Sequence, residues 1–502
     1  MSDPFHFDLI IRNGTVVNAS DETQCDIGVR NGVVTCLGKN LPVPEGCKVI
    51  DAEGGWITPG GVDSHVHIGQ NQGNAQSADD WTTGTRGAIA GGTTTVVAFA
   101  VQVRGEKVMP AVEAYYDLAD GKTHCDYSFH AIISDPTDEV VDKELAELVK
   151  FGVTSVKVYM TYADMALNDR QMLDILAGSR RHGLTTMVHA ENHDIIEWMA
   201  ERLLKQGMSE PMHHGTSRPQ LVEDEATQRA LALAEVIDAP MLLVHVSAKE
   251  ATRAIRKAQT RGLPIYGETC PHYALLTAEK MQAPGFLGAK CVCSPPLRSD
   301  PSDKAGIWEG LANGTFTVLS SDHAPFNFFD ETGKKYGLIE NTTKNPAGNF
   351  RAIPNGIPGI NTRSPLLWSY GVLEGRISRQ RFVELNSSNA AKLYGMYPKK
   401  GTIQPGSDAD FVIWRSDASR KSTIIKQENM HHGVDYTPYE DMEVKDWPRL
   451  VILRGEVVYD GESNQIMNQP GGGEFIKRRL SSLPGPRGTS RAWINDFQPH
   501  KI

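Results

Sequence analysis

Five side chains that can bind a metal ion stand at or near the ends of apolar segments in this sequence. They lie in the segments DSHVH, MVHAEN, LVHVSA and LSSDH, and they are His65, His67, His189, His245 and Asp322. Neutral imidazole and carboxylate are the usual protein ligands of zinc and related divalent ions. Taken singly, each histidine could be a hydrogen-bonded core residue, and Asp322 could cap a helix. As one set they indicate a metal centre, and five ligands suit two ions better than one tetrahedral ion.

A lysine occupies the middle of another apolar segment, VTSVKVYM, at residues 153–160. An isolated ammonium in a dry interior is so costly that it finds a partner or gives up its proton. Lys157 could therefore pair with a buried carboxylate, or its neutral amine could react with carbon dioxide to give a carbamate. A carbamate has two oxygens that could hold one metal ion each. Beside five candidate ligands, we favour the carbamate, which makes Lys157 a bridge between two ions.

The segments that carry these residues belong to a regular series of strand and helix candidates. Strands are expected at 56–68, 93–100, 126–133, 153–160, 185–191, 241–247, 264–270 and 316–323. Helix-like segments follow several of them, for example at 144–152, 170–183, 225–239 and 248–262. This order favours an α/β fold, a (β/α)8 barrel of the TIM type. A doubly wound open sheet is the alternative, but no glycine fingerprint for a dinucleotide follows the first strand.

A barrel of this kind would bring the candidate ligands together. Active sites of such barrels lie at the C-terminal ends of the strands, which is where these polar residues fall. His65 and His67 are two positions apart, so on a strand both rings project from the same face. Asp322 closes the eighth strand candidate. We therefore expect all of them at one mouth of the barrel.

The two ends of the chain have a different character. The opening alternates apolar and polar residues around two Asn-Gly pairs, a strong hairpin signal, and residues 400–460 are similar. Because chain termini often lie close together, we expect both ends to build one small β-sandwich. The predicted divisions are 1–58 (N-terminal part of the sandwich), 59–399 (barrel), 400–463 (C-terminal part of the sandwich) and 464–502 (an extended arm rich in Gly and Pro).

Composition excludes several other classes of protein. The net charge is −10 over 502 residues, which argues against nucleic acid as a partner. The longest apolar stretches are too short to span a bilayer, and MSDPFHFD does not look like a secretory signal. The sequence has seven cysteines, an odd number, and no CxxC motif, so they do not look like a disulfide framework or a zinc knuckle. A reducing, cytoplasmic setting is therefore expected.

Seven motifs along the chain, in their order, resemble those of a known family. HVH, KVYMTY, VHAEN, VHVSAKEA, CSPPLR, SSDHAPF and IPNG, within a barrel flanked by β segments, resemble the cyclic amidohydrolases. Among these the sequence is most similar to dihydropyrimidinases, especially the fungal type, and to D-hydantoinases. The resemblance covers roughly residues 7–460.

The resemblance implies a role for each candidate residue. The ligands of one zinc ion would be His65, His67 and Asp322, and those of the other His189 and His245, with carboxylated Lys157 and a hydroxide as bridges. Asp322 would take the proton of the hydroxide and pass it to the leaving amide nitrogen. Tyr162 would steady the oxyanion. The alternative is a loop tyrosine with its hydroxyl at the surface, which its spacing of five residues from Lys157 disfavours. Ser294 and Asn355, otherwise ordinary turn residues, would read the amide edge of the ring.

The implied reaction is ring opening of a cyclic ureide to an N-carbamoyl amino acid. Dihydrouracil and dihydrothymine are the favoured substrates, D-hydantoinase activity on 5-substituted hydantoins is the alternative, and allantoinase is less favoured. The segment HVHIGQNQGNAQ (65–76) lacks the arginine expected of a dihydroorotase, and its polar character suits a small ring. Non-catalytic scaffold homologues lack metal ligands, whereas every ligand position is filled here. The family also implies a homotetramer, with the C-terminal arm reaching a neighbour.

Overall fold

The computed structural model describes residues 6–71, 75–339 and 348–487. Its centre is an eight-stranded parallel sheet, in which each strand lies beside its neighbour in sequence. The strands are β8 (Gly61–Val66), β9 (Thr93–Val101), β10 (Asp126–Ile132), β11 (Ser155–Tyr159), β12 (Thr185–His189), β13 (Met241–Leu243), β14 (Ile265–Thr269) and β15 (Val318–Leu319). Beyond β15, His323 bridges to Val66 of β8, which brings the first and last strands together. The predicted barrel is therefore confirmed.

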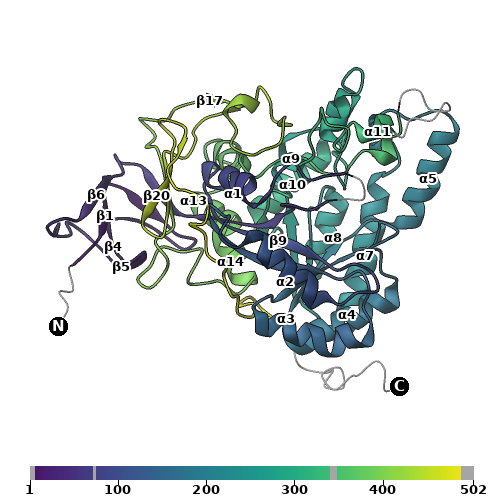
Figure 1. Cartoon of the computed structure of the whole chain (residues 1–502), viewed down its shortest axis with the longest axis horizontal. Coiled ribbons are helices and arrows are strands. Elements are labelled where there is room, and N and C mark those ends of the chain that lie inside the picture. Colours follow the sequence, from purple (N-terminus) through teal and green to yellow (C-terminus); the bar gives the residue numbers. More distant parts are fainter. Residues whose placement is uncertain (1–5, 72–74, 340–347, 488–502) are drawn as a thin grey trace.

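Helices lie between the strands and surround them (Figure 1). The predicted helices are present as α3 (Leu145–Phe151), α4 (Asp169–His182), α7 (Gln220–Ile237) and α8 (Lys249–Thr260). The other α-helices are α1 (Trp81–Ala90), α2 (Val108–Ala119), α5 (His193–Lys205), α6 (Met212–Thr216), α9 (Pro271–Leu275), α10 (Pro301–Asn313), α11 (Tyr336–Ile339), α12 (Arg363–Leu367), α13 (Arg379–Val383) and α14 (Asn389–Leu393). Across the described residues, no helix has the length and apolar character needed to span a membrane.

Strands from both chain ends lie side by side next to the barrel (Figure 1). A seven-stranded sheet has the order β21 (Gln465–Ile466), β20 (Glu456–Asp460), β19 (Leu450–Leu453), β16 (Phe411–Trp414), β7 (Trp56–Pro59), β2 (Thr15–Val17), β3 (Glu22–Gln24). A four-stranded sheet has the order β5 (Val33–Gly38), β4 (Asp26–Arg30), β1 (Leu9–Arg12), β6 (Lys48–Asp51). Ile11 and Ile27 of the smaller sheet share one apolar cluster with Phe411 of the larger. A further pair joins β17 (Thr423–Ile424) to β18 (Glu443–Val444).

Two details of the predicted strands are wrong. Residues 56–68 are not one strand, because the chain passes from β7 in the terminal sheet to β8 in the barrel between Pro59 and Gly61. The pair Asn31–Gly32 makes the expected two-residue hairpin turn, with φ of 49° and 73°. Asn13–Gly14 does not make a hairpin, because it separates β1 and β2, which belong to different sheets.

The described part of the C-terminal arm packs on the barrel of its own chain. Phe475 bridges to Tyr127 at the start of β10. Arg478 is only 3% exposed, and its guanidinium donates to the hydroxyls of Ser128 at 3.0 Å and Ser155 at 2.9 Å. The arm therefore covers the N-terminal end of the barrel, opposite the mouth where the candidate ligands lie. Residues 488–502 of the predicted arm lie outside the described residues.

Candidate metal centre

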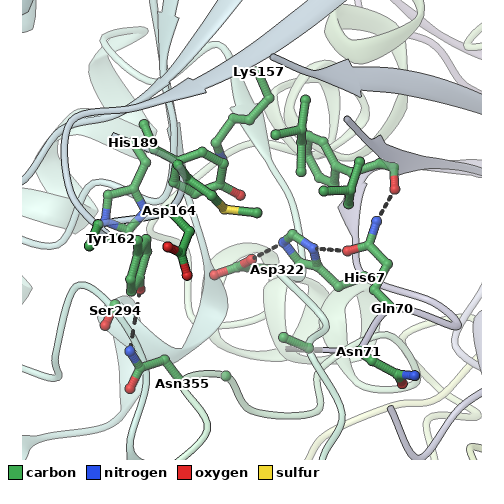
Figure 2. A pocket seen from close by; sticks show the side chains of 18 of the residues that line it. His67, Gln70, Asn71, Lys157, Tyr162, Asp164, His189, Ser294, Asp322 and Asn355 are labelled. Atoms are coloured by element: carbon green, nitrogen blue, oxygen red, sulfur yellow. Dashed lines mark hydrogen bonds and ion pairs between the residues drawn. The ribbon is translucent and has the colours of Figure 1, made fainter. Parts of the chain in front are cut away.

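Three of the candidate ligands meet at the barrel mouth. His65 belongs to β8, His67 follows it, and Asp322 comes three residues after β15. Asp322 Oδ1 lies 3.1 Å from His65 Nε2 and 3.5 Å from His67 Nε2. Each of the three residues offers one ligand atom, and these three atoms all lie within 4.8 Å of one another. Figure 2 shows the carboxylate of Asp322 beside the ring of His67, joined to it by a dashed line.

The other two histidines adjoin this group. His189 ends β12, and His245 comes two residues after β13. Their ring centroids are 4.4 Å apart, and the His245 ring is 5.5 Å from that of His65. All five residues singled out as ligands are therefore gathered at one place, although they come from four different parts of the chain.

Lys157, at the middle of β11, is 1% exposed and lines the same cavity (Figure 2). Its Nζ lies 5.2 Å from the ring centroid of Phe99 and 5.1 Å from that of Tyr159. Burial lowers the pKa of Lys157 to about 8, although the charges of Asp322 and Glu268 oppose that shift. Among the residues that the structure describes, no carboxylate forms an ion pair with this amine within 4.0 Å. The buried ion pair considered as an alternative for Lys157 is thus not formed here.

Hydrogen bonds to carboxylates fix which nitrogen of His65 and of His189 faces the site. His65 Nδ1 lies 2.6 Å from Glu268 Oε1, and His189 Nε2 lies 2.8 Å from Glu191 Oε2. An ionised carboxylate only accepts, so these nitrogens carry the protons. The lone pairs of His65 Nε2 and His189 Nδ1 are then free for a metal ion. Such carboxylate–histidine pairs are typical of metal sites.

His67 is oriented in a similar way by an amide. Its Nδ1 lies 2.6 Å from Gln70 Oε1, and Gln70 Nε2 donates to the carbonyl of Phe99 (Figure 2). Since the amide nitrogen is engaged with Phe99, the oxygen must face His67 and Nδ1 must donate. The lone pair of His67 Nε2 is therefore directed towards Asp322.

Burial and charge keep these groups in the states that a metal requires. Burial lowers the pKa of His67, His189 and His245, so their rings are neutral at pH 7. Burial alone would raise the pKa of Asp322, but the positive charge that His65, His67 and His245 carry when protonated lowers it far below its usual range, so Asp322 stays ionised. His65 Nε2 and His245 Nδ1 are buried without a hydrogen-bond partner among the described residues. Neutral imidazoles, an ionised carboxylate and orphaned nitrogens together fit a metal centre.

Sequence reasoning missed Glu268, Glu191 and Gln70, the residues that orient the histidines. Glu268 stands in the strand segment PIYGETC and Glu191 in VHAEN. A carboxylate near the end of a predicted strand was therefore the one feature of the sequence that could have pointed to them as partners of the histidines. Burial alone would raise the pKa of Glu191, but Arg218, whose Nη1 lies 2.7 Å away, lowers it to about 2. The pairing of Glu268 with His65 joins residues far apart in sequence, and only the fold reveals it.

Tyr162, Ser294 and Asn355, the predicted substrate contacts, line the same cavity, which has a volume of about 960 Å³. Asn355 Nδ2 lies 3.4 Å from the Tyr162 hydroxyl (Figure 2). Burial raises the pKa of Tyr162, so its hydroxyl stays protonated and can donate. Gln70 and Asn71, from the polar segment 65–76, also line the cavity, while residues 72–74 lie outside the described chain.

Three residues of this group have a left-handed backbone, with φ of 69° at Tyr162, 40° at His245 and 48° at Asp322. This conformation is disfavoured for residues with a side chain, and it persists only where the surroundings enforce it. Its occurrence three times at the mouth of one barrel sets this region apart as a site rather than ordinary loop packing.

A second acidic cluster, formed by Asp126, Asp408 and Asp410, is buried elsewhere. Lys400 Nζ lies among its carboxylates, at distances of 2.5, 2.8 and 2.6 Å. Lys400 and Arg454, which also pairs with Asp126, supply the positive charge of this cluster. Lys400 ties β10 of the barrel to the segments that lead into the terminal sheet.

Replacing Glu268 by glutamine tests the orientation of His65. The amide can present a donor to Nδ1 and so stabilise the wrong ring tautomer. We expect the affinity for Zn²⁺ to fall about 10–100-fold, measured by titrating the metal-free protein. Glu113→Gln, on the exposed face of α2, is the matched control and should bind as the wild type does. Equal affinity in both variants would contradict this role of Glu268.

Comparison with known proteins agrees with this architecture. The model of the Amidohydrolase family matches residues 56–458. The D-hydantoinase of Ralstonia pickettii is 41% identical over 473 residues, which is 94% of this chain and 99% of that protein. The dihydropyrimidinase of Rattus norvegicus is 36% identical over 479 residues, 94% of this chain and 89% of that one. The chain therefore belongs to the Amidohydrolase family.

Solved structures show the same likeness. A D-hydantoinase structure with 41% sequence identity superimposes with a TM-score of 0.88, covering 94% of this chain and 99% of the other. The crystal structure of dihydropyrimidinase from Brevibacillus agri, with 38% identity, gives a TM-score of 0.89 and covers 95% and 99% of the two chains.

Proposed function

We propose that this protein hydrolyses the ring amide bond of small cyclic ureides to give N-carbamoyl amino acids. The observation that carries the proposal is the gathering of four imidazoles, Asp322 and Lys157 at one cavity of about 960 Å³. Membership of the Amidohydrolase family, with relatives named D-hydantoinase and dihydropyrimidinase, supports the same reaction.

Two divalent ions, with zinc the first choice, would be held by this site. One would use His65, His67 and Asp322, and the other His189 and His245. When bound, such ions supply an activated water at neutral pH and polarise the substrate carbonyl. The free lone pairs of the oriented histidines support this assignment.

Carboxylated Lys157 would join the two ions. At a pKa of about 8, roughly one amine in ten is neutral at pH 7. That neutral amine would attack carbon dioxide, forming an N–C bond and releasing one proton, to give an anion with two oxygens. Converting a buried cation into a bridging anion removes the charge that the aromatic walls of Phe99 and Tyr159 cannot neutralise.

The chain's own residues would carry the remaining steps. Asp322 would accept a proton from the attacking water and deliver it to the amide nitrogen that leaves. The Tyr162 hydroxyl would donate to the oxygen of the attacked carbonyl as negative charge develops there. Ser294 and Asn355 would hold the opposite amide edge of the ring.

Dihydrouracil and dihydrothymine are the substrates that we propose first, because Gln70 and Asn71 give the wall beside His67 a polar character. The D-hydantoinase alternative has its own support. The 41% identity to a protein named D-hydantoinase exceeds the 36% to the dihydropyrimidinase, and the cavity has room for a ring substituent. Allantoinase activity and a non-catalytic scaffold role rank below both.

Assays of the zinc-loaded protein with dihydrouracil, a 5-substituted hydantoin and allantoin, side by side, test the proposal. We expect the highest kcat/KM with dihydrouracil. A higher value with the hydantoin would favour the D-hydantoinase alternative. Hydrolysis of none of the three would contradict the proposed function.

We propose further that the protein acts in the cytoplasm as a homotetramer. The absence of a disulfide among its seven cysteines is compatible with a reducing compartment. The tetramer rests on the resemblance to the family.

A further inference from the structure

Lys334 is a buried lysine in the loop that follows Asp322, and the proposed chemistry does not use it. Its side chain is 0% exposed. The ammonium donates to three backbone carbonyls, those of Val292 at 2.9 Å, Pro354 at 2.6 Å and Gly356 at 2.6 Å. An ammonium has three N–H donors, so these bonds use its full capacity.

The three carbonyls belong to the two segments that carry the proposed substrate contacts. Val292 stands two residues before Ser294, and Pro354 and Gly356 flank Asn355. The backbone N–H of Gly356 also donates to the Val292 carbonyl, at 3.1 Å. Lys334 therefore joins CSPPLR and IPNG, which are far apart in sequence, at the backbone groups next to the site.

Burying an ammonium costs more free energy than filling the same space with an apolar side chain. Among the described residues no carboxylate pairs with Lys334. Burial lowers its pKa to about 7, and the three carbonyls oppose that shift because they accept from the charged form. A buried charge without a counterion destabilises a fold, and an apolar side chain of similar size would fill the space more cheaply. What an apolar side chain cannot do is hold three carbonyls at fixed distances from one atom.

We propose that Lys334 is a positioning residue that fixes the spacing between Ser294 and Asn355, and through it the affinity for the cyclic substrate. Asn355 also lies 3.4 Å from the Tyr162 hydroxyl. The three bonds from Lys334, here called the clamp, would therefore also orient the hydroxyl that is proposed to steady the oxyanion. The inference rests on the proposed function, because it assumes that these two segments bind the substrate. The contacts of the Lys334 side chain in the described part of the chain are with the three carbonyls and the ring of Phe326, not with the metal ligands, so we expect metal binding to be independent of it.

Lys334→Met tests the clamp in the full-length, zinc-loaded protein with dihydrouracil and the hydantoin. Methionine keeps the length and apolar stem but removes all three donors. We expect KM to rise about 10–100-fold, since a shift of about 1 Å at a binding group has effects of this size. Zinc content should equal that of the wild type. Lys335→Met, at the neighbouring half-buried position, removes the same charge and should leave KM unchanged.

A Met variant with the KM of the wild type would overturn the proposal. If its melting temperature were lowered at the same time, the role of Lys334 would be purely structural. If the Met variant does not fold, Lys334→Gln, which keeps two N–H donors, takes its place and must also raise KM. Failure of the proposed function is recognised separately, because the wild type would then hydrolyse no cyclic ureide.

Discussion

Lys157→Arg is expected to abolish hydrolysis, lowering kcat/KM by about 10³-fold or more. Arginine keeps the positive charge of the unmodified residue but cannot form a carbamate, because its guanidinium stays protonated. The two ions would then lose their bridge, and an added cation would stand beside the imidazoles. Kinetics and zinc content together measure the effect, with the wild type expected to hold two ions per chain and the variant at most one.

Two further variants separate the carbamate from general damage. Lys150→Arg, on the exposed face of α3, makes the same change and should retain two ions and full activity. Lys157→Ala leaves a space that a small carboxylate can enter, so added acetate or propionate should restore part of the activity. Full activity of Lys157→Arg would show that no bridging anion is needed at this position.

Asp322→Asn is expected to lower kcat by about 10²–10⁴-fold, the range for loss of a general acid–base group. Asparagine keeps an oxygen near His65 and His67 but cannot take up and return a proton. We therefore expect the loss mainly in kcat, measured at saturating dihydrouracil, with less effect on zinc content.

The control for this variant is Asp117→Asn, an exposed change on α2 that should alter neither kcat nor zinc content. A kcat of Asp322→Asn within about tenfold of the wild type would assign the proton transfer to another group. If the Asp322→Asn variant binds no zinc as isolated but reaches the wild-type kcat when zinc is added in excess, Asp322 would be a metal ligand only.

The barrel could be predicted because its strands are buried on both faces and read as apolar segments. Segments such as 126–133 and 185–191 appear in the structure as β10 and β12. What local pattern could not reveal is which sheet a strand joins. Trp56–Pro59 and Gly61–Val66 read as one segment, yet they pair with Phe411–Trp414 and Thr93–Val101 respectively.

The site was predictable only in part for a similar reason. His65, His67 and Asp322 have side chains whose type and strand-end position indicate metal binding, so the pattern alone singles them out. Glu268 and Lys334 contact residues distant in sequence, His65 in the first case and the carbonyls of two loops in the second. A carboxylate at a strand end gives Glu268 a weak signal and a lysine in a polar loop gives Lys334 none, and only the fold shows which groups they contact.

We propose that Lys157 carries a carboxyl group in the active protein. The most direct measurement is a crystal structure of the wild type saturated with zinc, examined at Lys157 Nζ. We predict electron density for a carboxyl group on that nitrogen, with one oxygen towards each of two metal ions. Density for an unmodified amine in fully metallated protein would contradict a carbamate at Lys157.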